Sequence, residues 1–523
     1  MDAILGEVTH FRRRKKLNEM TKGESLGEAY KRTLSRILAQ PRSRPKLGME
    51  VLLWVSHAER PLHVDELCHA LGVEGSTDLG IGNIPAIKTL LSCSRGLVTV
   101  EKSSYTVRLV HYTLQEYLFN NTNLLPHPHS TIAEVCLTYL NFPYVRSFPP
   151  AFRSIPPTAR FLQYASCHWG THASLDTTES VRTLALKLLD RYDKHIASKV
   201  LLLHCVRVEE QPLSRYGVPT GFTGLHGAAY FGCVELVVAL LETNKGDVLA
   251  TDLHGNNAIA WASKRGNEEV VRVLLEWRGV HSDAPNRKYG SAPLLWAAKN
   301  GHEGVVRILL ERSDVNPDKL DKNLRTPLWW ASGGGHEGIV RMLLKRNDVN
   351  PDKPDRRQQT PLSWASESGF VGVVGVLLER NDVNPDKPDK NRRTPLHLAS
   401  SGGHEGVARI LLERNDVNPN KRDFFGWTPL SLASDDGHEG VVSILLERDD
   451  ISPDKQTILR QTPLLLACWN GHKGVARMLL ERKDVNPHKR DFFRLTPLWW
   501  AYNSGHHGGV RMLREQNHTN TYR

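Results

Sequence analysis

The chain has 523 residues, of which 40% are hydrophobic and 24% are charged. These proportions are typical of folded globular proteins and exclude a largely disordered chain. Lys and Arg outnumber Asp and Glu by 68 to 57, a mild basic excess that is compatible with an acidic partner but does not require one.

Residues 1–27 are predicted to form a mobile basic segment. It contains an uninterrupted basic run of the kind that is typical of nuclear-import signals. The run consists of Arg12, Arg13, Arg14, Lys15 and Lys16. No apolar stretch follows it, so we expect no secretory signal. This interpretation places the protein inside the cell and favours the nucleus over the cytoplasm.

Residues 28–120 are predicted to form a separate module. Apolar periodicity predicts several short helices, and two β-like runs follow them. The helices are expected near 28–38, 47–57, 63–71 and 84–93, and the β-like runs at 97–101 and 105–111. Helices followed by a hairpin in this order are typical of a winged helix, a fold that often binds DNA.

The candidate recognition helix of this module is poorly suited to reading bases. Between Ile84 and Ser94 the only charged residue is Lys88, and the other side chains include an apolar face. Base edges are read by polar and charged side chains. We therefore do not expect direct nucleic-acid binding, and we expect this face to pack against a neighbouring domain.

The amino-acid sequence of the module resembles that of a known receptor family. Residues 51–62, 65–67 and 108–118 are similar to the winged-helix segment of fungal NACHT-type receptors, and residues 161–172 are similar to their helical linker. The resemblance covers roughly residues 28–175 and assigns 121–220 to a helical linker. In those receptors the segment follows a nucleotide-binding domain and precedes ankyrin repeats.

The nucleotide switch of that family is missing its main element. In the family a His at the end of the winged helix senses nucleotide, and His111 lies at the matching place between Val110 and Tyr112, which depart from the motif. No G-x-x-x-x-G-K-[ST] loop occurs in the chain. We therefore expect His111 to be structural, expect no cofactor, and rank a degenerate NACHT-type receptor switch last among the candidate functions.

Residues 221–523 contain nine copies of a unit that recurs about every 34 residues. Its Thr-Pro-Leu start lies at Thr326, Thr360, Thr394, Thr428, Thr462 and Thr496, with weaker versions at Thr223, Asn257 and Ala292. Thr caps a first helix, Pro suits its first turn, and Gly ends it about nine residues later. A second apolar helix follows, and then Asp-Val-Asn-Pro-Asp-Lys supplies turn-forming residues. Because one unit cannot bury its apolar face alone, the units are expected to stack.

This unit resembles the ankyrin repeat, which has the same period and the same Thr-Pro-Leu start. Residues 394–414, TPLHLASSGGHEGVARILLER, carry the resemblance most clearly. The resemblance implies a mainly α fold: a winged-helix-like module followed by an ankyrin-repeat α-solenoid with short hairpin arms. It also implies protein binding through the arm tips or the concave face of the first helices.

Two features depart from the family or are ambiguous. The Gly expected two residues before the Thr is replaced in five arms. The backbone of these turns must therefore either be strained or adopt another geometry. The replacements are Leu324, Gln358, Arg392, Arg460 and Arg494. A stripe of large apolar residues lies four residues after each cap position, and we expect it to be core rather than an exposed stacking platform. Its members are Trp261, Trp296, Trp330, Trp364, Leu398, Leu432, Leu466 and Trp500.

Two C-terminal arms combine basic and aromatic residues and form the predicted partner-binding site. The residues are Lys421, Arg422, Phe424, Phe425, Trp427, Lys489, Arg490, Phe492 and Phe493. Aromatic anchors beside Arg are typical of binding hot spots. The expected partner is another protein with an acidic or hydrophobic segment. The alternative for the Phe pairs is packing between neighbouring arms.

No catalytic or metal-binding motif is recognisable. The His-Glu pairs at 302, 336, 404 and 438 lack the second His of a zinc protease and follow the repeat. The seven Cys form no C-x-x-C pair, which argues against a disulfide framework or a zinc knuckle. No apolar run reaches the ~18 residues of a membrane span. We expect no enzyme, no catalytic residue, no metal and no membrane partner.

The favoured function is therefore a non-enzymatic protein-interaction scaffold or adaptor with a regulatory role. The array is expected to be monomeric. The alternative is a nuclear ankyrin-repeat transcriptional co-regulator that binds a transcription factor, with the run Arg12–Lys16 directing import.

Overall fold

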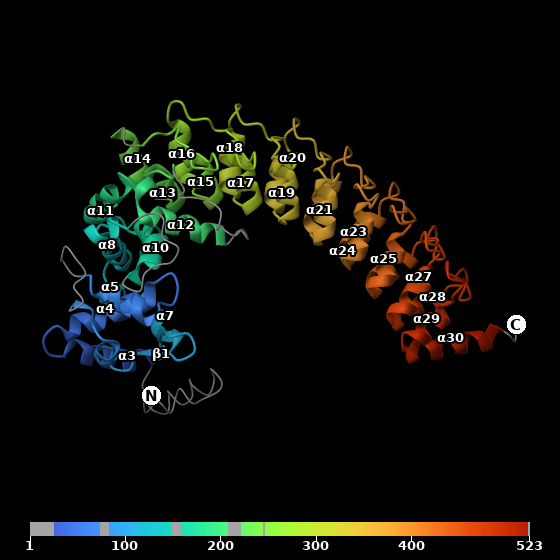
Figure 1. Ribbon diagram of the computed structural model, residues 1–523, viewed down its shortest axis with the longest axis horizontal. Coiled ribbons are helices and arrows are strands. Elements are labelled where there is room, and N and C mark those ends of the chain that lie inside the picture. Colours follow the sequence, from blue (N-terminus) through green and yellow to red (C-terminus); the bar gives the residue numbers. More distant parts are fainter. Residues whose placement is uncertain (1–25, 74–82, 149–158, 208–220, 244–245, 521–523) are drawn as a thin grey trace. The chain divides into compact units, whose positions relative to one another are not determined.

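A computed structural model of the chain describes residues 26–73, 83–148, 159–207, 221–243 and 246–520. The chain divides into two compact units, the first made of Met1–Ala262 and Arg272–Val280 and the second of Ser263–Val271 and His281–Arg523. Both are mainly helical, as the sequence predicts (Figure 1). The basic run Arg12–Lys16 lies outside the described residues.

The N-terminal module has the predicted order of helices and hairpin. Its elements are α3 (Leu26–Leu38), α4 (Arg44–His57), α5 (Val64–Leu71), α6 (Ile87–Cys93), β1 (Val98–Glu101), β2 (Thr106–Leu109) and α7 (Tyr112–Asn120). The strands are antiparallel, with Val98 opposite Leu109. His63, just before α5, forms a β-bridge with Thr106, so a short third segment extends the hairpin. This arrangement is that of a winged helix.

His111 and the candidate recognition helix α6, both noted in the sequence, have structural roles in the module. His111 is the N-cap of α7, and its Nδ1 accepts the backbone N–H of Thr113 at 3.3 Å. In α6, Leu90 and Cys93 are buried, and the carbonyl of Cys93 accepts a hydrogen bond from Gln40 Nε2 at 2.7 Å. Part of the candidate recognition helix is therefore packed inside the module, whereas Ile84, Ile87 and Leu91 on its apolar face are half-buried.

A bundle of helices follows the winged helix. It contains η2 (Thr122–Leu124), α8 (Pro128–Leu140), α9 (Pro143–Arg146), α10 (Leu162–Leu175), α11 (Glu179–Leu189), η4 (Tyr192–Lys194) and α12 (Ile196–Arg207). Helix α8 packs against both α10 and α11. The aromatic side chains Tyr139, Phe161, Tyr164 and Trp169 are fully buried and fill the space between the helices.

A chain of hydrogen bonds ties this bundle to the winged helix. Tyr164 accepts the backbone N–H of Glu59 at 3.1 Å and lies 2.9 Å from His172 Nε2. His172 Nδ1 lies 2.9 Å from His129 Nδ1. Burial, together with the nearby His129 and His168, lowers the pKa of His172 to about 3, and burial lowers the pKa of His168 to about 4. Both imidazoles are therefore neutral in the folded protein at neutral pH.

The first unit should lose stability as the pH falls from about 6.5 toward 4. An unfolded His binds a proton near pH 6.5, whereas folded His172 and His168 do not until the pH reaches about 3 and about 4. The unfolded state then binds more protons, and each such His removes up to about 1.4 kcal/mol per pH unit. Hydrogen exchange of α8 and α10 at pH 7 and pH 5 measures the loss. His172→Gln should reduce this pH dependence, and an unchanged pH dependence in that variant would contradict the assignment.

The rest of the chain is a succession of helix pairs along the sequence, and the pairs within the second unit stand one after another (Figure 1). The first helices of the pairs are α13 (Gly224–Phe231), α15 (Ala258–Arg265), α17 (Pro293–Asn300), α19 (Pro327–Gly333), α21 (Pro361–Ser368), α23 (Pro395–Ser401), α25 (Pro429–Asp436), α27 (Pro463–Asn470) and α29 (Pro497–Asn503). The second helices are α14 (Val234–Glu242), α16 (Glu268–Glu276), α18 (Glu303–Leu310), α20 (Glu337–Leu344), α22 (Val371–Leu378), α24 (Glu405–Leu412), α26 (Glu439–Leu446), α28 (Lys473–Glu481) and α30 (His507–Asn520). Within the second unit, from α17 onward, first helices pack on first helices and second helices on second helices, so the repeats form two layers.

The residues of the repeat act as the sequence predicts. The hydroxyl of Thr326 accepts the backbone N–H of Trp329 at 3.0 Å and caps α19, and Pro327 occupies its first turn. At the other end of a first helix, Gly301 adopts φ of 79° and ends α17. A Cβ at Gly301 would lie 2.7 Å from the ring of His336, so both conformation and space require Gly here.

Polar side chains join each repeat to the one before it. In one junction, His404 Nε2 lies 3.0 Å from the carbonyl of Glu367, and Arg414 donates to the carbonyl of Leu378 at 3.2 Å. The second bond recurs at every junction of the central array, where Arg346, Arg380, Arg414, Arg448 and Arg482 each donate to the carbonyl 36 residues earlier. The His-Glu pairs thus supply junction bonds, whereas Phe370 replaces the His in one repeat.

The five arms without Gly keep the usual turn, and the residue that replaces Gly adopts a strained backbone conformation. Leu324, Gln358, Arg392, Arg460 and Arg494 have φ values of 63°, 62°, 63°, 54° and 63°. Gly426, at the same place in its own arm, has φ of 77°. The backbone is therefore left-handed in both classes of arm. For a residue with a Cβ this conformation costs roughly 1–2 kcal/mol.

Glycine at these positions should stabilise the array. For Leu324→Gly and Gln358→Gly we expect a gain of about 0.5–1 kcal/mol each, because relief of the left-handed strain exceeds the added backbone entropy of Gly in the unfolded chain. Urea unfolding of the full chain measures the gain. Asn323→Gly and Arg357→Gly, one residue earlier and without positive φ, are the matched controls and should lower stability. Equal losses at both positions would contradict the strain.

Candidate partner-binding surface

Each arm is a hairpin turn built on a buried polar residue. In the arm at 423–427, Asp423 Oδ1 accepts the backbone N–H groups of Phe425 and Trp427 at 2.9 and 2.8 Å. The N–H of Asp423 donates to the carbonyl of Trp427 at 2.9 Å and closes the turn. The two residues after the Asp, Phe424 and Phe425, therefore form the tip of the arm. Asp321, Asp355, Asp389 and Asp491 hold equivalent positions and are also buried.

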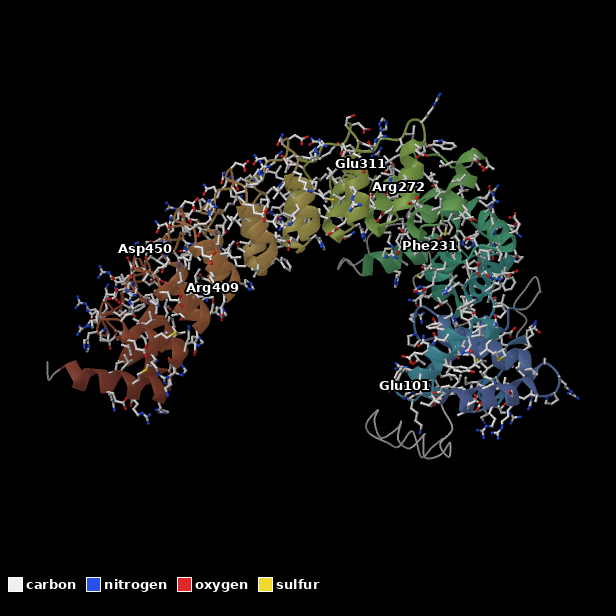
Figure 2. All side chains as sticks on the ribbon, turned by 180° about the vertical axis from the view of Figure 1, so that it is seen from behind. Glu101, Phe231, Arg272, Glu311, Arg409 and Asp450 are labelled. Carbon is white, nitrogen blue, oxygen red and sulfur yellow. The ribbon has the colours of Figure 1, made fainter. Side chains whose placement is uncertain are left out.

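The backbones of successive tips are hydrogen-bonded to one another. The N–H of Phe424 donates to the carbonyl of Asn391 at 2.8 Å, that of Ile458 to Phe425 at 3.0 Å, and that of Phe492 to Leu459 at 2.9 Å. The tips therefore form one continuous line along an edge of the array. Figure 2 shows the side chains that project along this edge, and it labels Asp450 in the segment that leads from α26 into one arm.

The predicted Phe pairs lie fully at the surface. Phe424, Phe425, Phe492 and Phe493 are 52% to 65% exposed. Within each pair the rings meet edge to face, with centroids 5.4 Å apart in the first pair and 5.6 Å in the second. Each Phe pair therefore remains largely accessible to solvent.

A third apolar tip lies between the two Phe pairs. Ile458 is 60% exposed and Leu459 is 46% exposed. Sequence reasoning missed this arm because it contains no aromatic residue. The signal was present in the register, since Ile458 and Leu459 lie 34 residues after Phe424 and Phe425. We name the six side chains at 424, 425, 458, 459, 492 and 493 the apolar tips.

The other predicted site residues are tied into the arms to different degrees. Lys421 Nζ donates to the carbonyl of Asp386 at 2.9 Å, and Lys489 Nζ donates to the carbonyl of Asp454 at 2.9 Å. Trp427 is half-buried. Arg422 is exposed but donates to the carbonyl of Gly426 at 3.2 Å and to that of Gln456 in the next arm. Arg490 is exposed. The two Lys ammonium groups thus serve the junctions between arms.

The stripe of large residues on the first helices is only partly core. Trp261, Trp296, Leu398 and Leu466 are buried as expected, whereas Trp330, Trp364, Leu432 and Trp500 are half-buried. The prediction of a core position is wrong for Trp330, because its neighbour Trp329 occupies the buried place. The Trp330 ring instead lies 4.4 Å from Lys299 Nζ, and its Nε1 donates to Asp321 at 3.3 Å.

The exposed side of the first helices is the alternative binding face. On it, Lys299 lies over two Trp rings, and Glu367 accepts a hydrogen bond from Gln359 at 2.9 Å. Asp435 accepts one from Asn470 at 2.7 Å, and burial raises the pKa of its carboxyl. These groups are engaged with their own neighbours, whereas the apolar tips are exposed.

Comparison with known families decides the nature of the array. A family model for ankyrin repeats matches residues 225–321, 313–389, 372–457 and 450–522, which together cover more than half of the chain. The chain belongs to the ankyrin-repeat family. The ankyrin array accounts for the paired helices, the Thr caps and the hairpin arms, and its presence implies binding to other proteins.

The N-terminal module matches a second family. Residues 35–127 are similar to the winged-helix domain of GPI inositol-deacylase. The winged helix that the sequence predicts is thereby confirmed, although the likeness found is to that enzyme's domain. A search of curated proteins finds no match to the chain.

Two further properties concern the described part of this ankyrin-repeat protein. Every helix there falls short of the length and hydrophobicity that crossing a bilayer requires. Within the same ranges, His, Cys, Asp and Glu side chains do not gather in a group of three or more that could hold a metal ion.

Proposed function

We propose that the protein is a non-enzymatic interaction scaffold whose ankyrin array holds a partner protein at the apolar tips. The observation that carries the proposal is the exposure of six apolar side chains on three successive arms: Phe424, Phe425, Ile458, Leu459, Phe492 and Phe493. Contiguous exposed apolar surface is uncommon on soluble proteins and marks interaction sites.

The backbone below the apolar tips is already ordered. Each tip is fixed by the buried residue at its base, as Phe425 is by Asp423, and by one hydrogen bond to the preceding tip, as Ile458 is to Phe425. A partner therefore does not have to order these loops when it binds. Such preorganisation lowers the entropic cost of association and leaves more of the hydrophobic gain for affinity.

Cations border the apolar tips and suit an acidic partner. Arg460 and Arg494 follow two of the tips directly and are exposed, and Arg490 precedes one of them. At the rim of an interface, such charges mainly set the association rate and its salt dependence. The aromatic side chains should instead set the dissociation rate, because their packing contacts are short-range and form only after the two proteins have met.

The nuclear co-regulator is the second candidate from the sequence. It rests on the run Arg12–Lys16, which lies outside the described residues. We therefore propose only the scaffold function, and we assign it to the ankyrin array.

Removal of the Phe pairs tests the proposed site. A partner captured with the full chain should bind Phe424→Ala/Phe425→Ala more weakly by more than ~2 kcal/mol, since truncated hot-spot aromatics cost that much. Fluorescence anisotropy or calorimetry with the purified partner gives the affinity, and circular dichroism checks the fold. Because all four rings are exposed, the array should melt as the wild type does.

A matched control removes exposed aromatic residues outside the arms. Trp499 and Tyr502 lie on α29 and are exposed, so Trp499→Ala/Tyr502→Ala should leave the affinity unchanged. If the partner binds equally well after both Phe pairs are removed, the proposed site fails. The face of the first helices around Lys299, Glu367 and Asp435 then becomes the binding site.

A further inference from the structure

The chemistry of the arm tips changes once along the array. In the four arms before Phe424, the exposed side chains at the two positions equivalent to Phe424 and Phe425 are mostly basic. They are Arg287, Lys322, Arg356, Arg357 and Lys390, which we name the basic tips. In the three arms that follow, the tips are apolar. The sequence suggests that basic and aromatic residues coincide at the same arms, and Arg460 and Arg494 do lie beside apolar tips. At the first two positions after the base of each arm, however, the basic and apolar side chains occupy two successive stretches.

The basic tips project beyond the acidic residues of their own arms. Asp321, Asp355 and Asp389 are buried at the base, where they accept backbone N–H groups. Asp389 also pairs with Arg393 at 3.0 Å, at the base of its arm. Among the described residues, no carboxylate forms an ion pair with any of the five basic tips. The positive charge therefore faces solvent without local neutralisation.

The two stretches belong to one continuous line. The N–H of Arg356 donates to the carbonyl of Asn323 at 3.0 Å, and that of Lys390 donates to Arg357 at 2.9 Å. The same bond joins Phe424 to Asn391 at 2.8 Å, where the basic stretch ends and the apolar stretch begins. The spacing of tips is thus the same on both sides of this boundary.

We propose that a single extended segment of the partner protein lies along the tips, with acidic residues on the basic tips and apolar residues on the apolar tips. The inference rests on the proposed function, because its apolar half occupies the site proposed there. Packed helices lie about 8–10 Å apart, and an extended residue spans about 3.3 Å. One arm therefore corresponds to about three residues of the segment, and its anchors should recur about every third residue.

A nucleic acid fits this line less well than a protein segment. Its phosphates are charged at every nucleotide and require cations along the whole length. Base stacking also needs accessible ring faces, whereas Ile458 and Leu459 at the middle apolar arm have none. Segregated charge and apolar surface instead match a segment that is itself acidic in one half and apolar in the other.

Defined peptides test the segregation on the full chain. The segregated probe is a fluorescein-labelled 18-residue synthetic peptide with a Glu-rich half, followed by a half with Leu at every third position. The interleaved probe has the same composition with its Glu and Leu residues distributed evenly along the whole length, and the third probe is the Leu half alone. By anisotropy, the segregated probe should bind at least about fivefold more tightly than either of the others, because only it matches both stretches.

Charge reversal locates the acidic half. Arg356→Glu/Arg357→Glu/Lys390→Glu should weaken the segregated probe about tenfold at low salt and much less at high salt, since exposed charges are screened. It should not change binding of the Leu half. The matched control, Arg307→Glu/Arg409→Glu/Arg477→Glu, makes the same charge change at exposed positions on the second helices and should leave the affinity for the segregated probe unchanged. Figure 2 marks Arg409.

The outcomes separate the inference from the proposed function. If the Leu half binds, loses affinity on Phe424→Ala/Phe425→Ala, and gains nothing from the acidic half, the inference fails while the proposed site stands. Equal weakening by both charge-reversal variants would also overturn the inference, because it would show only an effect of net charge. Binding by none of the peptides would overturn both, and tighter binding of a single-stranded oligonucleotide would reassign the line to nucleic acid.

Discussion

Each repeat is held to the one before it by side chains that donate hydrogen bonds to backbone carbonyls of the preceding repeat. His404, Arg414 and Lys421 reach the carbonyls of Glu367, Leu378 and Asp386, which lie 37, 36 and 35 residues earlier. These separations hardly vary along the central array, so they fix the register between neighbours. Since one repeat cannot bury its apolar face alone, the fold depends on this register.

The same register determines where the protein can bind. Most of the regular charges of the repeat serve the fold: Arg414 pairs with Asp416 at 2.7 Å, and Lys421 lies 3.3 Å from Asp386. The side chains of the apolar tips have no such role, whereas among the basic tips Lys322 Nζ donates to the carbonyl of Arg287. Because the backbone of each tip is bonded to the next, as Phe492 is to Leu459, these residues form a line whose chemistry can change without disturbing the array.

The sequence predicts the parts of this architecture that follow from local rules. The period, the Thr caps, the Gly ends and the winged-helix order are all readable, because each depends on one residue type at one spacing. The half-buried position of Trp330 could not be predicted from the sequence, because which of two adjacent Trp residues is buried depends on the neighbouring repeat. The bonds of Lys421 and the apolar tip at Ile458 were missed for the same reason, since both become evident only when residues 34 or 35 apart are placed together.

The arm tips form a preorganised line and not a set of independent loops. Hydrogen exchange of individual amides distinguishes these two arrangements. The N–H groups of Lys390, Phe424, Ile458 and Phe492 each donate to the preceding tip. We expect them to exchange as slowly as amides of the adjacent helices, because they open only when the junction between repeats opens. Exchange at the rate of an unprotected peptide would instead show that each tip is an independent loop.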